Sequence, residues 1–143
     1  MAIPDRIERT VEFAHPPAKV WAALTTAEGL GSWFGDSAAI DLRPGGPAEV
    51  RWDGGYLIDL TVERVEEPTV FGFAWKMPGL PEDEPYHTHV EFTLEPIAAG
   101  TRLHVVETGF ARMPAPIADN EFTGHTQGWP KELDDLAGYL DAA

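Results

Sequence analysis

Residues 122–140 read FTGHTQGWPKELDDLAGYL, and their large apolar side chains recur at spacings of three and four. This spacing is the period of an amphipathic α-helix, so it predicts a helical stripe about 20 residues long. Gly124, Gly128 and Pro130 are poor helix formers, so tertiary packing must hold the first half of this helix. The stripe consists of Phe122, His125, Trp129, Leu133, Leu136 and Leu140.

Most of the chain before this helix alternates apolar and polar residues at period two, which is typical of half-buried β-strands. The first strand covers residues 7–13, and five more follow between residues 48 and 107. They are joined by short turns such as Asp53-Gly54-Gly55. Strands joined in this way form an antiparallel meander, and a lone amphipathic helix must cover its apolar face. The sequence therefore predicts an α+β fold with a six-stranded antiparallel sheet.

Two short helices are expected after the first strand. The segment PPAKVWAALT, residues 16–25, begins with two prolines, which suit the first turn of a helix. Thr26 can cap a second helix over residues 27–33, and Gly35-Asp36 can end it. The predicted order of elements is thus one strand, two short helices, five strands and one long helix.

Composition limits the class of protein and of partner. With 143 residues, 43% hydrophobic and 24% charged, residues 1–143 fit one globular domain, and no apolar run approaches the roughly 20 residues of a bilayer span. The 24 acidic and 10 basic residues give a formal net charge of −14, which disfavours nucleic acid and leaves neutral, cationic or apolar ligands. The absence of cysteine excludes disulfides and fits a cytoplasmic location.

Four segments resemble the START-like (SRPBCC) superfamily, and more narrowly its branch of activator of heat-shock-protein-90 ATPase homologues. The resemblance covers nearly the whole chain, and the segments lie in the order of the family. It implies a helix-grip fold, in which the sheet curls around the last helix and encloses a cavity for apolar molecules. The segments are VWAALTTAEGLGSWFG (20–35), ERVEEPTVFGFAW (63–75), TRLHVVETGF (101–110) and HTQGWPKELDDLAGYL (125–140).

The resemblance leaves three functions open. The favoured one is binding of a small apolar or aromatic molecule, with no cofactor. The second is an enzyme of the cyclase, aromatase or hydrolase type that uses Glu107 or His125 as acid or base. The third is a chaperone ATPase cofactor that acts through protein–protein contact, which is less expected because the family's eponymous activator has a further N-terminal domain. The sequence carries no nucleophile elbow, cysteine nucleophile or phosphate loop, which favours binding over catalysis.

Six aromatic residues are expected to face the space between sheet and helix. Periodicity alone favours a solid core, whereas the resemblance implies that some of these rings line a cavity. Rigid aromatic rings suit such walls, because Trp and Tyr also offer a polar edge to a ligand. The six residues are Trp33, Phe71, Phe73, Trp75, Phe122 and Trp129.

Glu107 and His125 are the candidate polar anchors of this cavity. Glu107 follows Leu103 and Val105 on the inward face of its strand, so strict alternation would bury its carboxylate. A buried carboxylate must be paired, hydrogen-bonded or protonated, and His125 on the inward stripe of the last helix can be its partner. The alternative is that the strand ends in water near Gly109. For His125, a role in packing alone also remains open.

Two other features receive a structural interpretation. His87, His89 and Glu91 share one strand face, and the neighbouring strand adds His104, but this face lies opposite the apolar residues of the strand. An open outer face supports metal ligands poorly, so no metal site is expected. The loop 77–86 is expected to be mobile, and its acidic run 81–85 is either a solvated loop or a lid at the cavity mouth.

Overall fold

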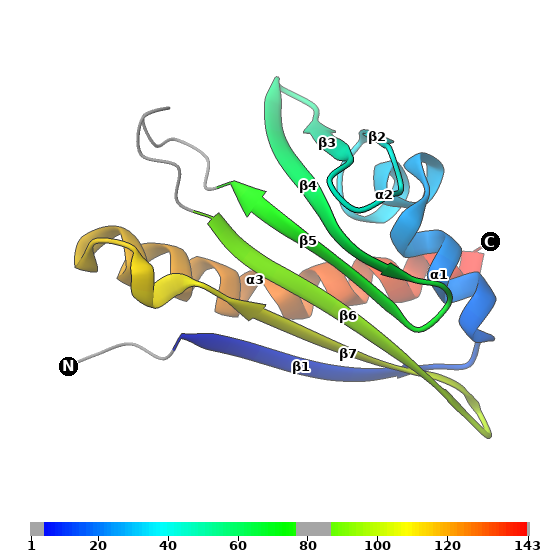
Figure 1. The fold of residues 1–143 in the computed structure, drawn as a ribbon. Coiled ribbons are helices and arrows are strands. Elements are labelled where there is room, and N and C mark those ends of the chain that lie inside the picture. The colour runs from blue at the N-terminus through cyan, green and yellow to red at the C-terminus, as the bar shows by residue number, and fades with distance from the viewer. Residues whose placement is uncertain (1–4, 77–86, 143) are drawn as a thin grey trace.

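The computed structural model describes residues 5–76 and 87–142. Its strands form one sheet in the order β1-β7-β6-β5-β4-β3-β2, with every neighbouring pair antiparallel, and α3 runs along one face of this sheet (Figure 1). The predicted α+β helix-grip fold is confirmed. The strands are β1 (Arg6–Phe13), β2 (Ser37–Ile40), β3 (Pro47–Trp52), β4 (Tyr56–Glu66), β5 (Val70–Lys76), β6 (His87–Ile97) and β7 (Gly100–Thr108). The helices are α1 (Pro17–Thr25), α2 (Ala27–Trp33), the 3-10 turn η1 (Phe110–Arg112) and α3 (Ala115–Ala142).

The sheet has seven strands, one more than the six expected from the sequence. The additional strand is β2, whose four residues pair with β3 from Ser37↔Arg51 to Ile40↔Ala48. Its sequence SAAI carries two alanines and no clear alternation, so period two gives no signal there. It lies at the edge of the sheet, where a short strand leaves few backbone groups unpaired.

The two short helices form as expected and pack closely on one another. The Thr26 hydroxyl accepts a hydrogen bond from the Gly29 N–H at 3.0 Å, which caps α2. A Cβ atom at Gly29 would lie 2.5 Å from the Ala23 carbonyl oxygen, so only glycine permits this close approach. The Trp33 indole N–H donates to the same carbonyl at 2.7 Å. These contacts join α2 to α1 and fix the position of the residues that follow α2.

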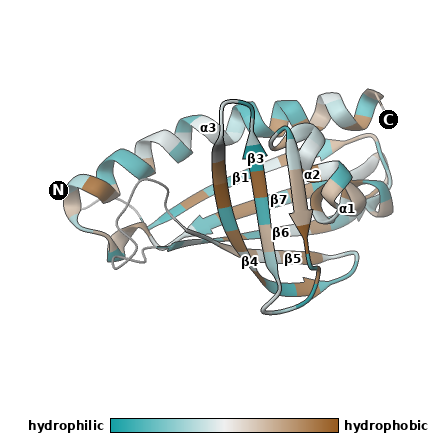
Figure 2. Cartoon of the chain, turned by 90° about the horizontal axis from the view of Figure 1, so that it is seen from above, coloured by the Kyte–Doolittle hydropathy of each residue, from teal (hydrophilic) through white to brown (hydrophobic). Residues whose placement is uncertain are grey.

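The core lies between the inward face of the sheet and α3. Hydrophobic and hydrophilic residues alternate in colour along the strands in Figure 2, as period two predicts. On α3 the buried side chains follow the predicted stripe. None of the described helices is long and apolar enough to cross a bilayer. On β6, β7 and α3 the buried residues are Thr88, Val90, Phe92 and Leu94 (β6), Thr101, Leu103, Val105 and Glu107 (β7), and Ala118, Trp129, Leu133, Leu136 and Leu140 (α3).

The long helix α3 accommodates a proline in its interior. It begins at Ala115 rather than at Phe122, where the apolar stripe starts, and it continues through Pro130. Proline has no N–H, so it cannot donate to the carbonyl four residues earlier, which belongs to Thr126. The guanidinium of Arg9 on β1 donates to that Thr126 oxygen at 3.3 Å. A side chain from the sheet thus replaces the missing helical hydrogen bond.

Arg9→Met retains the apolar stem of the side chain and removes its donor. We expect this variant to lose about 1 kcal/mol of unfolding free energy, because the Thr126 carbonyl loses the partner that replaces the helical bond. In a Pro130→Ala background the helix regains an N–H for that carbonyl, so Arg9→Met should cost much less there. Urea denaturation of the four proteins measures the coupling. Equal losses in both backgrounds would show that Arg9 does not compensate for Pro130.

Candidate functional site

Glu107, near the end of β7, is fully buried and surrounded by hydrogen-bond partners. Its Oε2 accepts from the Thr88 hydroxyl on β6 at 2.5 Å, and its Oε1 accepts from the Trp129 indole N–H on α3 at 2.9 Å. The Nδ1 atom of His125 lies 2.8 Å from Oε2 and 2.9 Å from Oε1. The strand therefore does not end in water at this point. Glu107 is a buried carboxylate that joins two strands to the helix.

His125 is held between two carboxylates. Its Nδ1 faces Glu107, and its Nε2 lies 3.3 Å from Oε2 of Glu121, one turn earlier on α3. Burial alone would lower the pKa of His125, but the hydrogen bond and charge of Glu107, together with Glu121, outweigh burial and raise that pKa. The ion pair therefore stabilises the fold fully below about pH 6.5, the ordinary pKa of histidine. This contribution is lost as the pH rises through the raised pKa.

Next to this cluster lies a pocket of about 470 Å³ between α3 and the strands β3 to β5. Its sheet side is formed by large apolar side chains, and Phe34 closes it from the end of α2. The rings of Phe34 and Trp75 contact edge to face, with centroids 5.5 Å apart. The lining residues are Phe34, Trp52, Ile58, Trp75, Gly124, His125, Gly128, Trp129 and Glu132.

Two glycines of α3 provide room for the pocket. Gly124 and Gly128 are four residues apart and therefore share one face of the helix. A Cβ atom at either position would meet no other atom within 4 Å, so close packing does not require glycine there. Each glycine destabilises a helix interior by roughly 0.5–1 kcal/mol relative to alanine. The helix propensity at these two positions is therefore lower than alanine would give. The space beside them stays open because glycine has no side chain.

Two residues of the pocket lining each carry a buried polar atom whose hydrogen-bonding capacity is unsatisfied within the described part of the chain. Among the described residues, neither Nε1 of Trp75 nor Oε2 of Glu132 has a hydrogen-bond partner, although both atoms are buried. Burial raises the pKa of Glu132 to about 7, while Lys131 lowers it and Asp135 raises it. The apolar pocket is thus bordered by one residue with an unsatisfied donor and one with an unsatisfied carboxylate oxygen.

The structure separates the residues expected from the sequence into two groups. Three of them line the pocket, namely Trp75, His125 and Trp129. Glu107 is not part of the lining, but it forms hydrogen bonds with His125 and Trp129. Phe71 and Phe73 pack against Phe92 in the core, Phe122 packs edge to face on Phe110, and Trp33 lines a neighbouring polar pocket.

Six pocket residues were not expected from the sequence: Phe34, Trp52, Ile58, Gly124, Gly128 and Glu132. Trp52 and Ile58 follow the inward alternation of their strands, so the sequence period predicts that they are buried. It does not predict that they line a pocket. Phe34 lies in the turn after α2, where no period applies. Glu132 follows Trp129 by three residues and thus borders the inward stripe. Because other charged residues stand around it in the sequence, the sequence gives no sign that this glutamate differs from an exposed one.

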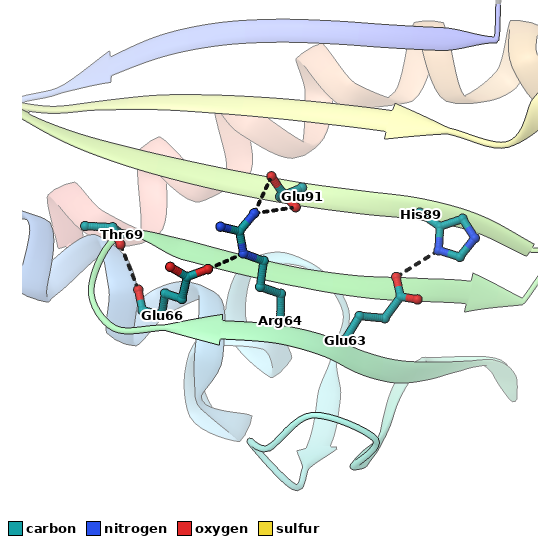
Figure 3. Close-up of polar contacts among 6 residues, drawn as sticks. All are labelled: Glu63, Arg64, Glu66, Thr69, His89 and Glu91. Atoms are coloured by element: carbon teal, nitrogen blue, oxygen red, sulfur yellow. Dashed lines mark hydrogen bonds and ion pairs between the residues drawn. The ribbon is translucent and has the colours of Figure 1, made fainter.

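The outer face of the sheet carries ion pairs instead of a convergent site (Figure 3). His89 pairs with Glu63 at 2.8 Å, and Arg64 pairs with Glu66 and Glu91. His104 lies 2.8 Å from the Thr10 hydroxyl. Within residues 5–76 and 87–142, no group of three or more possible ligands is arranged to hold a metal ion. The acidic segment 77–86, expected as a loop or lid, lies outside the described residues.

Comparison with known proteins agrees with the fold. The family model described as activator of Hsp90 ATPase homolog 1-like protein matches residues 14–141. The chain belongs to this family. A search of curated proteins finds no match.

Several solved structures resemble this family member. Protein MLL2253 from Mesorhizobium loti is 25% identical, with a TM-score of 0.83 over 96% of this chain and 98% of that chain. DynU16, a protein in the dynemicin biosynthetic locus, is 25% identical, with a TM-score of 0.79 over 97% of this chain and 48% of that chain. The Aha1 dimer from Colwellia psychrerythraea shares the fold at 22% identity, with a TM-score of 0.73 over 94% and 95% of the two chains.

Glu107→Gln tests the buried cluster. We expect this variant to lose about 3 kcal/mol of unfolding free energy at pH 6, because the imidazolium of His125 loses its buried counter-charge. Urea denaturation followed by tryptophan fluorescence measures this loss. Glu121→Gln removes the more exposed carboxylate beside His125 and should cost much less. Equal losses in the two variants would contradict a special role for Glu107.

Glu132→Gln tests the unpaired carboxylate. A buried acid with a raised pKa favours the folded state less as it ionises, so wild-type stability declines between the ordinary pKa of glutamate and about pH 7. We expect Glu132→Gln to raise the melting temperature at pH 8 and to change it little at pH 5. Asp134→Asn removes the same charge from an exposed position of α3 and serves as the control. A gain at pH 8 that is equal in both variants would contradict the effect of burial.

Proposed function

We propose that this protein binds a small apolar or aromatic molecule in the pocket between α3 and strands β3 to β5. The supporting observation is the pocket itself, because aromatic walls face two helix glycines beside which no side chain fills the space. Its volume of about 470 Å³ lies within the usual range of small-molecule sites. The positions of Trp75 and Trp129 in its walls agree with this function.

The family and its neighbours are consistent with this proposal. The match to the Hsp90-activator homologue family supports a helix-grip protein that holds a ligand. The neighbour DynU16 is a protein of a biosynthetic locus, which agrees with a metabolite as ligand. We infer an apolar or aromatic ligand from the aromatic side chains that line the pocket of this chain.

The residues of the site take different roles in this proposal. Trp75 and Trp129 form the walls, and His125 is a polar group at the pocket surface that Glu107 holds in place. The aromatic residues behind the walls, Trp33, Phe71, Phe73 and Phe122, support them. Both ring nitrogens of His125 already face carboxylates, so this histidine has no free nitrogen for a substrate proton. We therefore propose binding rather than acid–base catalysis.

Binding of N-phenyl-1-naphthylamine, a neutral aromatic dye that fluoresces in apolar surroundings, tests the proposal. We expect saturable binding to the wild type and a loss of about tenfold or more in Gly128→Leu, because the new side chain fills the pocket. Gly128→Leu should fold, since a Cβ atom at this position meets no neighbour and leucine has a higher helix propensity than glycine.

Gly138→Leu is the matched control for this experiment. Gly138 also lies in α3 with open space beside it, but it is not part of the pocket lining. This variant should bind the dye like the wild type. Undiminished dye binding by Gly128→Leu would place the dye elsewhere and overturn the proposed site.

A further inference from the structure

A second, polar pocket of about 410 Å³ adjoins the apolar one. The two share three residues, Phe34, Trp52 and Glu132, so one wall has an apolar space on one side and a polar space on the other. The rings of Phe34 and Trp52 meet edge to face there, with centroids 5.9 Å apart. A ligand in the apolar pocket therefore lies against the same three side chains that border the polar pocket.

The charges around the shared wall are mainly negative. Asp36, Glu132 and Asp135 contribute three carboxylates to the polar pocket, and Lys131 contributes one ammonium group. Lys131 pairs with Asp135 at 3.1 Å, and Asp36 accepts a hydrogen bond from the Asp53 backbone N–H at 2.6 Å. Glu132 differs from these two carboxylates, because its buried Oε2 has no partner among the described residues. Within residues 5–76 and 87–142, neither Glu132 nor Asp36 forms an ion pair, and of the two only Glu132 has a buried oxygen without a hydrogen-bond partner.

We propose that the ligand carries a protonated amine, which binds at the shared wall against the rings of Phe34 and Trp52 and the carboxylate of Glu132. This inference rests on the proposed function, because the apolar part of the same ligand would fill the apolar pocket. The ligand class is thus an aromatic or apolar amine.

The chemistry of the wall favours an ammonium group over other polar groups. Aromatic faces attract cations, and a carboxylate forms a stronger hydrogen bond with a charged donor than with a neutral one. A hydroxyl group would meet Glu132 but would leave its charge uncompensated. A ligand carboxylate would be repelled by Glu132, Asp36 and Asp135, and the net charge of −14 attracts cations to the protein.

Binding of an ammonium group should change the protonation of Glu132. Burial raises the pKa of Glu132 to about 7, so the free protein holds a proton on this residue in part of its molecules near neutral pH. A bound cation favours the ionised form, so binding should release protons from the complex. The charged neighbours of Glu132 are Lys131 and Asp135 on α3 and Asp36 after α2. The other titratable group of the apolar pocket is His125.

Three probes with the same ring separate the amine from the apolar part: 2-(2-naphthyl)ethylamine, 2-(2-naphthyl)ethanol and 2-naphthylacetate. In competition with N-phenyl-1-naphthylamine at pH 7, we expect the amine to bind about tenfold more tightly than the alcohol, and the carboxylate to bind least. Glu132→Gln should bring the affinity for the amine close to that for the alcohol. Asp134→Asn, which changes an exposed carboxylate outside both pockets, should retain the preference.

Calorimetry of the wild type in two buffers of different ionisation enthalpy provides a second readout that needs no variant. Proton release on binding the amine, and none on binding the alcohol, would support the assignment. Equal affinity for the amine and the alcohol, or tightest binding of the carboxylate, would overturn the amine and leave the apolar binding function intact. Failure of all three probes and of the dye to bind would overturn both.

Discussion

The hydrogen bonds of Glu107 connect the sheet to the long helix at its most buried point. A carboxylate removed from water is stable only with partners, and here one strand supplies Thr88 while α3 supplies His125 and Trp129. The two helix residues are four positions apart, so they lie on one face of α3. Because both side chains bond to the single carboxylate of Glu107, the rotation of the helix about its axis is fixed.

This rotation determines which residues of α3 border the pocket. Gly124, Gly128 and Glu132 follow one another at intervals of four, directly beside the stripe that contains His125 and Trp129. With that stripe held against β6 and β7, the glycine row turns toward the aromatic side chains of β3 to β5. The pocket is therefore a consequence of the buried ion pair together with two missing side chains.

The sequence predicts the fold well because its periods are long and consistent. Period two in the strands and the spacing of Leu133, Leu136 and Leu140 predict the sheet and the helix, while the four residues of β2 are too few to show a period. The inward direction of Glu107 was also predictable. The family resemblance predicted a cavity between sheet and helix, and Trp75, His125 and Trp129 line it. Periodicity alone does not predict this pocket, because it shows which face is buried but not whether the opposite wall is filled. Phe34 and Glu132 reach it through tertiary packing alone.

The two halves of α3 contribute differently to the protein. Its C-terminal half packs Leu133, Leu136 and Leu140 at full burial, and each such side chain contributes about 1.5–3 kcal/mol. Its first half carries two glycines and a proline, and Glu132, whose buried Oε2 has no hydrogen-bond partner among the described residues, lies where the halves meet; these features lower stability. The first half is held on the sheet by the bonds of His125 and Trp129 to Glu107 and leaves space open beside its two glycines. Filling that space with protein side chains would raise stability and remove the room for a ligand.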